Sequence, residues 1–311
     1  MQTRYSPLVV TAGVMSALAV VFGVLMVADP RTIEGAPSWL KPAKFAISTA
    51  LYAGTLAWVL RHLTTWPRLT RTAAHVTAWV FAVEVALVAL QAGRGTVSHF
   101  NTSTPLDGAI FSVMGVAIAL QTLAAVAVTW ALWRQPFADR ARGWALRLGM
   151  ALTVVGASTG GLMPPPTAAQ LARVEATGEM PRSGAHTVGA PDGGPGLPGT
   201  GWSLTHGDLR VPHFVGLHAM QTLPLVAWLV AGLRRESARV AAVVGAGVSY
   251  GALFVILLAQ ALAGESVAAP SPATVVALGA WAALSLASAL AVRRIVVAAP
   301  GQAGTTSLEV A

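Results

Sequence analysis

Four ionisable side chains stand close together where a long polar segment meets an apolar run. They are Asp208, Arg210, His213 and His218. An ionisable group beside or inside a membrane helix is costly unless it has a partner or a function. Histidine and aspartate supply acid–base chemistry or metal ligands, and arginine offers a fork for an anion. We therefore predict that His213, His218 and Asp208 are catalytic, and that Arg210 binds substrate.

The two histidines of this junction do not share one helical face. Five residues separate them, which is a rotation of about 140° on an α-helix. His218 shares its face with Gln221, so a polar stripe continues along the helix and Gln221 is a candidate substrate-binding residue. The alternative interpretation is structural, with His213 at the membrane interface and His218 hydrogen-bonded inside the bundle.

A third histidine, His99, lies in a segment rich in hydroxyl and amide side chains, and Asn101 is close to it in sequence. We predict His99 as a catalytic residue and Asn101 as a substrate-binding residue. His99, His213 and His218 are also the candidate ligands of a metal. Zinc would need about four ligands, one of which can be water.

The basic residues of the predicted outer face form a second group. Lys41 and Lys44 are the two lysines of the chain, against eighteen arginines. Lysine is a compact and flexible point charge. Together with Arg94 and Arg210, these lysines are predicted to hold an anionic group of the substrate. Two alternatives stay open: the lysines reach towards lipid headgroups, or the arginines neutralise nearby aspartates.

Glu84 is the acidic residue that falls near the middle of a predicted membrane helix. It is a candidate proton relay, because ionisable groups inside membrane helices often mark proton or ion pathways. The alternative is a neutral glutamic acid that is hydrogen-bonded to a glutamine of a neighbouring helix, such as Gln121, Gln221 or Gln260.

The composition indicates an integral membrane protein. The chain has 311 residues, of which 55% are hydrophobic and 10% are charged, whereas soluble domains carry roughly 25% charged residues. The long apolar runs lack the alternation of a membrane β-barrel, so we predict helices. We interpret the first run as a retained membrane helix and not as a cleaved signal peptide.

Eight transmembrane helices are predicted, with both termini in the cytoplasm. Thirteen of the twenty basic residues lie in short segments on one side of these helices, as the positive-inside rule expects. This all-α polytopic bundle forms a single domain over residues 1–297, and residues 298–311 form a disordered cytoplasmic tail. The predicted helices are approximately Leu8–Ala28, Trp39–Leu60, Ala73–Gly93, Gly108–Trp133, a fifth ending at Pro164, Val211–Leu233, Val240–Gly264 and Ala273–Val292.

The longest connection, residues 164–210, is predicted to lie outside the cytoplasm. Residues 167–175 suit a short surface helix, whereas residues 189–201 are rich in glycine and proline and must be irregular. Five of the seven histidines and eight of the twelve acidic residues fall on the outer face. The positive-inside rule explains the arginines of the other face but not this concentration of histidines, which is typical of a polar site.

Several classes of function are excluded or disfavoured. The net charge of +8 comes from the topology of the arginines, so we expect no nucleic-acid partner. Cysteine is absent, which excludes disulfides, thiolate metal sites and cysteine nucleophiles. The expected partners are the lipid bilayer and a small-molecule or lipid-like ligand. The sequence leaves the oligomeric state open.

Four stretches carry a resemblance to known proteins: Trp39-Leu-Lys-Pro-Ala-Lys-Phe, Arg94-Gly-Thr-Val-Ser-His-Phe-Asn, Gly184-Ala-His-Thr-Val-Gly and residues 207–218. In them the chain resembles a family of uncharacterised bacterial multi-pass membrane proteins. The resemblance implies a helical membrane fold over nearly the whole chain and implies no activity.

Ser98-His99, Asp107 and the histidines at 213 and 218 also look like the zinc site of alkaline-ceramidase-like membrane hydrolases. That site uses three histidines and an aspartate, with two histidines four residues apart. Here those two are five residues apart, and the serine directly precedes its histidine.

Our main hypothesis is an integral enzyme of the bacterial inner (cytoplasmic) membrane, of hydrolase, lyase or cyclase type. It would act on a lipid-like or prenyl-like substrate at the extracytoplasmic face by metal-assisted or acid–base chemistry. One alternative is a haem b or quinone electron-transfer protein, in which His99 and a later histidine are axial ligands. Another is a small-molecule transporter or sensor that uses Glu84.

Overall fold

The computed structural model describes residues 6–297 of the chain, with side chains described to residue 291. Arg4 and the predicted tail at 298–311 lie outside the described residues. The protein is mostly helical, with 70% of residues in helices. The helices are α1 (Ser6–Ala28), α2 (Leu40–Leu60), α3 (Pro67–Gly93), α4 (Pro105–Arg134), α5 (Arg140–Thr159), α6 (Ala168–Thr177), α7 (Arg210–Leu217), α8 (Ala219–Leu229), α9 (Glu236–Leu262) and α10 (Pro272–Val297).

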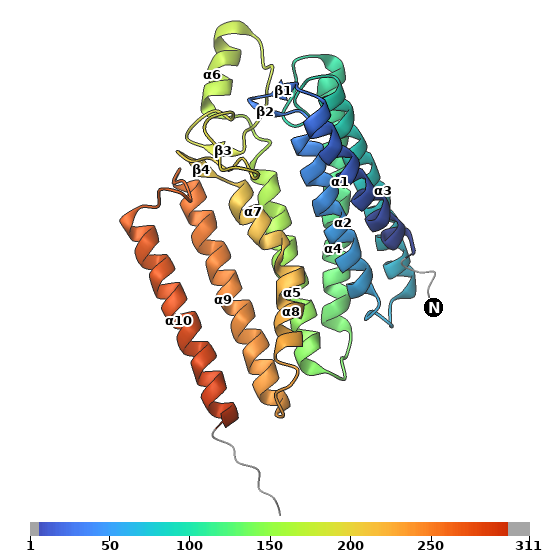
Figure 1. The fold of residues 1–311 in the computed structure, drawn as a ribbon, viewed down its shortest axis with the longest axis vertical. Helices are drawn as coiled ribbons and strands as arrows, with labels where there is room; N and C mark the ends of the chain where they lie inside the picture. Colours follow the sequence, from blue (N-terminus) through green and yellow to red (C-terminus); the bar gives the residue numbers. More distant parts are fainter. Residues whose placement is uncertain (1–5, 298–311) are drawn as a thin grey trace, which may run out of the picture.

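Short strands supplement the helices at one end of the molecule. β1 (Thr32–Ile33) pairs with β2 (Ala36–Pro37), and β3 (Thr187–Val188) pairs with β4 (Gly207–Asp208), both antiparallel. Figure 1 shows these strands and α6 above one end of a bundle of roughly aligned helices, which we call the capped end. α1 begins and α10 finishes at the opposite end (Figure 1).

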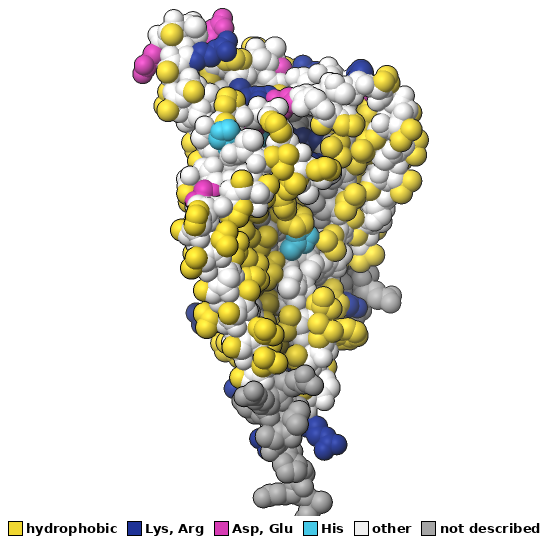
Figure 2. All heavy atoms as spheres, turned by 60° about the vertical axis from the view of Figure 1, so that its left-hand side comes forward, with side chains coloured by type: hydrophobic (Ala, Val, Ile, Leu, Met, Phe, Trp, Pro, Cys, Tyr) yellow, Lys and Arg dark blue, Asp and Glu magenta, His cyan; other side chains and the backbone are white. Residues whose placement is uncertain are grey.

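Within the described range, seven helices are long and apolar enough to span a membrane: α1, α2, α3, α4, α5 with the turn after it, α9 and α10. A backbone surrounded by lipid must satisfy its own hydrogen bonds, which a helix does. Most of the side chains on these helices point out of the bundle, and Figure 2 shows the resulting apolar flank. The chain is therefore a multi-pass membrane protein.

Three predicted helix starts were late by several residues. α3 begins at Pro67 and not at Ala73, and α4 begins at Pro105 and not at Gly108. Proline suits the first turn of a helix because its missing N–H has no partner there in any case. α9 likewise begins at Glu236, four residues before the predicted start. These first turns are polar, so the apolar runs alone did not include them.

The predicted helix Val211–Leu233 is broken into α7 and α8 at His218, and this prediction was wrong. The N–H of His218 is shared between the carbonyls of Phe214 and Val215, at 3.2 Å each. Pro224, inside α8, has no N–H to continue the regular hydrogen-bond ladder. α8 is then only 11 residues long.

Neighbouring helices satisfy the backbone groups beside this break. The Thr153 hydroxyl on α5 donates to the Leu217 carbonyl at 3.3 Å and accepts from the Met220 N–H at 3.1 Å. The Tyr250 hydroxyl on α9 donates to the Val215 carbonyl at 2.6 Å. Interrupted membrane helices are tolerated where such partners exist.

Two glycines allow α5 and α7 to touch. A Cβ atom added to Gly156 would lie 2.5 Å from the Gly216 Cα. Lipid tails are as apolar as leucine, so close van der Waals packing and not hydrophobic burial drives such contacts in a membrane. The contact holds the last turn of α7 against α5 below the capped end.

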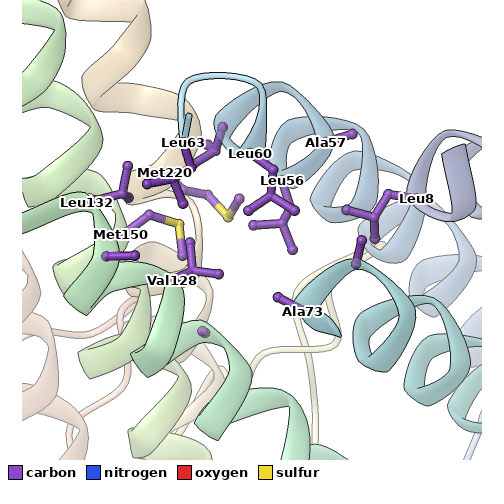
Figure 3. Close-up of a cluster of buried hydrophobic side chains, with 14 of the residues drawn as sticks. Leu8, Leu56, Ala57, Leu60, Leu63, Ala73, Val128, Leu132, Met150 and Met220 are labelled. Carbon is purple, nitrogen blue, oxygen red and sulfur yellow. The ribbon is translucent and has the colours of Figure 1, made fainter. Parts of the chain in front are cut away.

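The largest buried apolar cluster joins α2, α4, α5 and α8. Figure 3 shows Leu56 and Leu60 of α2 meeting Met150 of α5 and Met220 of α8. Leu56 and Leu60 belong to the part of α2 that is far from its first residue, Leu40. The largest buried apolar cluster therefore lies away from the capped end.

The long connection is ordered at the capped end. The predicted surface helix at residues 167–175 is present as α6, with a capping box between Thr167 and Gln170. Residues 189–201 contain no helix or strand, as their glycine and proline content predicted. This irregular segment lies next to β3 and β4 (Figure 1). It brings two backbone carbonyls, those of Thr200 and Gly201, to side chains near the starts of α2 and α7.

Candidate functional site at the capped end

Lys41 and Lys44 lie in the first turns of α2, three residues apart and therefore on one face. A helix N-terminus carries a partial positive charge, which disfavours cations and attracts anions. Two lysines at this place raise the positive potential further. Such a helix start needs a compensating negative group.

Lys44 and Arg210 hold the irregular segment by its backbone. The Lys44 ammonium donates to the Thr200 carbonyl at 2.9 Å, and Arg210 Nη2 donates to the Gly201 carbonyl at 2.6 Å. Arg210 also forms a two-pronged ion pair with Asp208, through Nε at 2.9 Å and Nη2 at 2.6 Å. Asp208 is buried, so its charge is neutralised within the protein.

The two cations converge beside Gly201, which has a positive φ of 70°. A Cβ atom at Gly201 would lie 3.9 Å from Arg210 Nη1 and 4.0 Å from Lys44 Nζ. Thr200 and Gly201 offer these cations only carbonyl oxygens. A carboxylate or phosphate oxygen is a stronger acceptor for them than a neutral carbonyl is.

The side-chain ammonium of Lys41 has no hydrogen bond or ion pair with any group in the described part of the protein. Its nearest aromatic contact is Phe45, whose ring centroid lies 6.0 Å from Nζ. Electrostatic interactions connect Lys41 with Glu34, His99, His186 and Asp192. An unpaired ammonium therefore lies among the polar groups of the capped end.

His186 and Asp192 form an oriented pair in the loop that precedes β4. His186 Nδ1 lies 2.6 Å from Asp192 Oδ2. Burial would raise the pKa of Asp192, but hydrogen bonds from the ring and backbone of His186 hold that pKa well below its usual range. Because the carboxylate is ionised, we assign the ring proton to Nδ1.

The same arrangement leaves His186 with a free lone pair. Burial lowers the pKa of His186, and this effect outweighs the hydrogen bond to Asp192, which raises the pKa. The imidazole is therefore neutral, with Nε2 as an acceptor that has no hydrogen-bond partner within residues 6–291. A histidine oriented by a carboxylate in this way is suited to act as a general base.

His99 lies beside this pair, in the loop between α3 and α4. Its Nδ1 is 3.0 Å from the Ser98 hydroxyl, and its ring centroid is 5.4 Å from that of Phe45. Burial lowers the pKa of His99 well below its usual value, and the charges of Lys41 and His186 act in the same direction. His99 is therefore also a neutral imidazole next to the unpaired lysine.

Arg94, predicted to bind substrate, is engaged by protein groups. It donates to Asp107 Oδ1 at 2.6 Å and to the Gln91 amide oxygen at 2.5 Å. Thr104 is the N-cap of α4, and its hydroxyl accepts from the Asp107 N–H at 3.1 Å. Arg94 therefore ties the end of α3 to the start of α4.

Asn101 is likewise engaged in the loop fold. Its amide donates to the Thr96 hydroxyl and the Val97 carbonyl, and its oxygen accepts from Ser103. Its backbone forms a β-bridge with Arg182. These bonds position the His99 loop against the long connection.

The two helical histidines point to different environments. His213 Nδ1 lies 2.8 Å from the Gly156 carbonyl, so it helps to fix the contact between α5 and α7. His218 lies at the break, with its ring centroid 4.2 Å from that of Phe214. Gln221 donates to the Thr55 hydroxyl on α2 at 3.2 Å.

His99, His213 and His218, the predicted metal ligands, do not form a metal-binding group. Among the residues that the structure describes, no three histidine, aspartate or glutamate side chains are placed to hold a metal ion. His186 is the histidine that interacts electrostatically with both His99 and His213.

Glu84 is buried inside the bundle, on α3, and is 1% exposed. Neither of its carboxyl oxygens has a hydrogen-bond partner. The hydrogen bond to Gln121, Gln221 or Gln260 that we considered as the alternative is therefore not formed. Lys41 is the charged group that interacts with Glu84.

His186 and Asp192 are not among the site residues predicted from the sequence. Their pairing depends on the turn of an irregular loop, which leaves no periodic signal. One signal was available: His186 belongs to Gly184-Ala-His-Thr-Val-Gly, one of the four stretches that carry the family resemblance. The carbonyls of Thr200 and Gly201 could not be identified, because any residue type supplies a carbonyl.

No protein-family model matches this chain, and comparisons with curated proteins and with solved structures found no match.

Proposed function

We propose that the protein is an enzyme of the bacterial cytoplasmic membrane that acts on a lipid-like or prenyl-like substrate with an anionic group. The chain would cross the membrane eight times, counting α7 and α8 as one crossing. Both termini would lie in the cytoplasm and the capped end outside it. The arginines at the opposite end of the bundle support this orientation.

One observation carries the proposal: the unpaired ammonium of Lys41 interacts electrostatically with a convergent pair of cations, Lys44 and Arg210, and with an oriented histidine. Lys41, Lys44 and Arg210 would hold the anionic group. Ligand oxygens would replace the carbonyls of Thr200 and Gly201 as acceptors. The apolar flank of the bundle (Figure 2) fits an amphiphile whose chain stays in the bilayer.

The chemistry would be proton transfer. With its Nδ1 proton held by Asp192, His186 would accept a substrate proton at Nε2 and return it later in the reaction. His99, neutral and close to the same lysine, would hydrogen-bond the substrate. Such a step fits a hydrolase, a lyase or a cyclase, and it needs no metal ligand set.

The test uses purified protein in lipid nanodiscs, with farnesyl diphosphate as the anionic probe and farnesol as its uncharged counterpart. Lys41→Met should weaken farnesyl diphosphate binding about 10- to 100-fold, since a charge-assisted hydrogen bond is lost. Farnesol binding should not change. Calorimetry measures both affinities.

The catalytic part needs a separate variant. His186→Ala should slow conversion of the probe, or of a total lipid extract, by about 10²- to 10⁴-fold, as followed by mass spectrometry of the products. His206→Ala is the matched control, because His206 is in the same connection and its ring is hydrogen-bonded to the neighbouring Thr205 hydroxyl, at 2.8 Å, and not to a carboxylate of the described residues. Equal turnover in the two variants would rule out the proposed base.

A small-molecule transporter or sensor is the second candidate. It is favoured by the interruption at His218, because transporters often bind substrate at discontinuous helices. This function predicts uptake of a ligand into proteoliposomes without chemical change, and a loss of uptake in Glu84→Gln. Conversion of the ligand by the reconstituted protein would favour the enzyme instead.

A further inference from the structure

Glu84 is a buried acid for which the fold supplies no hydrogen-bond partner. It is 1% exposed, and both carboxyl oxygens lack a donor. A carboxylate in such surroundings is far more costly than a neutral carboxylic acid. The position therefore favours the protonated form unless a nearby positive charge stabilises the anion.

The helices packed against α3 supply few charges. The helices in contact with α3 are α1, α2 and α4. α1 has no ionisable side chain, and the charged side chains of α4, Asp107 and Arg134, lie in its first and last turns. Asp107 is paired with Arg94. Neither Asp107 nor Arg134 interacts electrostatically with Glu84.

α2 provides the remaining titratable groups: Lys41, Lys44 and Tyr52. Of these, Lys41 interacts electrostatically with Glu84, and no direct ion pair joins the two. The Tyr52 ring lies edge-on to Phe81, one helical turn from Glu84, with centroids 5.2 Å apart. The Tyr52 hydroxyl accepts from the Gln121 amide at 3.3 Å.

We propose that Glu84 is a proton-binding site coupled to the anion site, so that an anionic group arriving at Lys41 causes Glu84 to take up a proton. This inference rests on the proposed anion site. Lys41 is the charge that favours ionised Glu84. A bound anion compensates that charge, and the neutral acid then becomes the preferred form.

The coupling must be reciprocal. If the anion makes Glu84 bind its proton more tightly, a protonated Glu84 makes the protein bind the anion more tightly by the same factor. A substrate would thus bring one proton into the interior of the bundle on binding and release it on leaving. The second ligand of the protein would therefore be a proton, which is taken up when the anion binds and released when the anion leaves.

Titration calorimetry of farnesyl diphosphate binding, in two buffers with different enthalpies of ionisation, counts the protons taken up. Protons exchanged by the ligand cancel in the difference between the wild-type protein and Glu84→Gln. We expect wild type to take up as much as one extra proton per bound anion at mildly alkaline pH. The affinity of Glu84→Gln, which mimics the neutral acid, should fall less as the pH rises.

Two controls separate the possible failures. Lys41→Arg keeps a fixed charge at the anion site, so the extra proton should persist there. Inorganic pyrophosphate tests whether the anionic group suffices without the prenyl chain. Binding with the same proton count in wild type and Glu84→Gln would overturn the coupling and leave the anion site intact. Absence of binding by both probes would overturn the anion site and the coupling with it.

Discussion

At the scale of single residues, the capped end combines charges that are neutralised with charges that are not. Arg210 is paired with Asp208, and His186 with Asp192. Lys41 has no such partner among the described residues. Paired charges stabilise the fold, whereas an unpaired ammonium among other polar groups is available to bind an anion. This difference separates Lys41 from Arg94, which the sequence presented as equivalent.

The two neutral histidines predict how stability depends on pH. Burial lowers the pKa of His99 and His186 below the usual 6.5. The unfolded chain therefore binds protons at a pH where the folded protein does not. The stability due to this difference is fully present above about pH 6.5 and is lost as the pH falls below it.

We expect the thermal unfolding midpoint in detergent to fall on acidification through this range. A His99→Gln/His186→Gln double variant should show a shallower fall, because glutamine does not titrate. Asp192, with its lowered pKa, adds a second loss of stability that begins only below its usual value of 3.8. Parallel profiles of the wild type and the double variant above pH 4 would contradict this assignment.

At the scale of elements, the close approach of Gly156 and Gly216 fixes α7 against α5, and Arg210 is the first residue of this short helix. Glycine is normally a poor helix residue, less favourable than alanine by about 1 kcal/mol. At Gly156 its missing Cβ is required by the Gly216 backbone. The usual preference for alanine is therefore reversed here.

This reversal can be measured with one pair of variants. Gly156→Ala should lower the free energy of unfolding by about 1–3 kcal/mol, because the new methyl group overlaps the α7 backbone. Gly115→Ala on α4 is the control, since a Cβ there meets no atom within 4 Å, and it should be neutral or stabilising. Equal unfolding midpoints for the two variants in detergent would show that α5 and α7 are not in this contact.

Much of the helical architecture was predictable from the sequence. Apolar runs of membrane-spanning length located the helices, and the glycine and proline content identified the irregular loop. The predicted starts of α3 and α4 were too late, because the first turn of each helix is polar and lies outside the apolar run. Hydrophobic runs therefore locate a membrane helix but do not give its first residue. The break at His218 depends on hydrogen bonds from Thr153 and Tyr250, which lie on other helices and leave no mark near residue 218.

The candidate site likewise has a part that was predictable from the sequence and a part that was not. The two lysines were found because they contrast with eighteen arginines, and Asp208 and Arg210 because they stand at a helix start. Whether a cation is already paired is a property of the tertiary fold. The engagement of Arg94 by Asp107, and of His186 by Asp192, could therefore not be predicted from composition or spacing.

At the scale of the whole molecule, most of the described acidic side chains lie in the connections at the capped end, whereas arginines stand in the connections at the opposite end. The absence of cysteine makes the proposed orientation directly testable. Ala176→Cys places a thiol on α6 at the capped end, and Ser237→Cys places one at the start of α9 at the opposite end.

A membrane-impermeant maleimide added to intact cells should label Ala176→Cys and not Ser237→Cys. Disruption of the cells should make both thiols reactive, which controls for exposure. The reverse labelling pattern would place the capped end in the cytoplasm and would remove the topological basis of the proposed extracytoplasmic site.

The site joins two distant parts of the chain, since its lysines stand near residue 40 and their partners between residues 186 and 210. During synthesis on the ribosome, α2 therefore enters the membrane long before the segment that will cover its lysines exists. The nascent amino-terminal half must hold two uncovered ammonium groups until α5 and the long connection emerge. The anion site is thus completed late, and a chain terminated after α4 carries its lysines without the groups that make them a site.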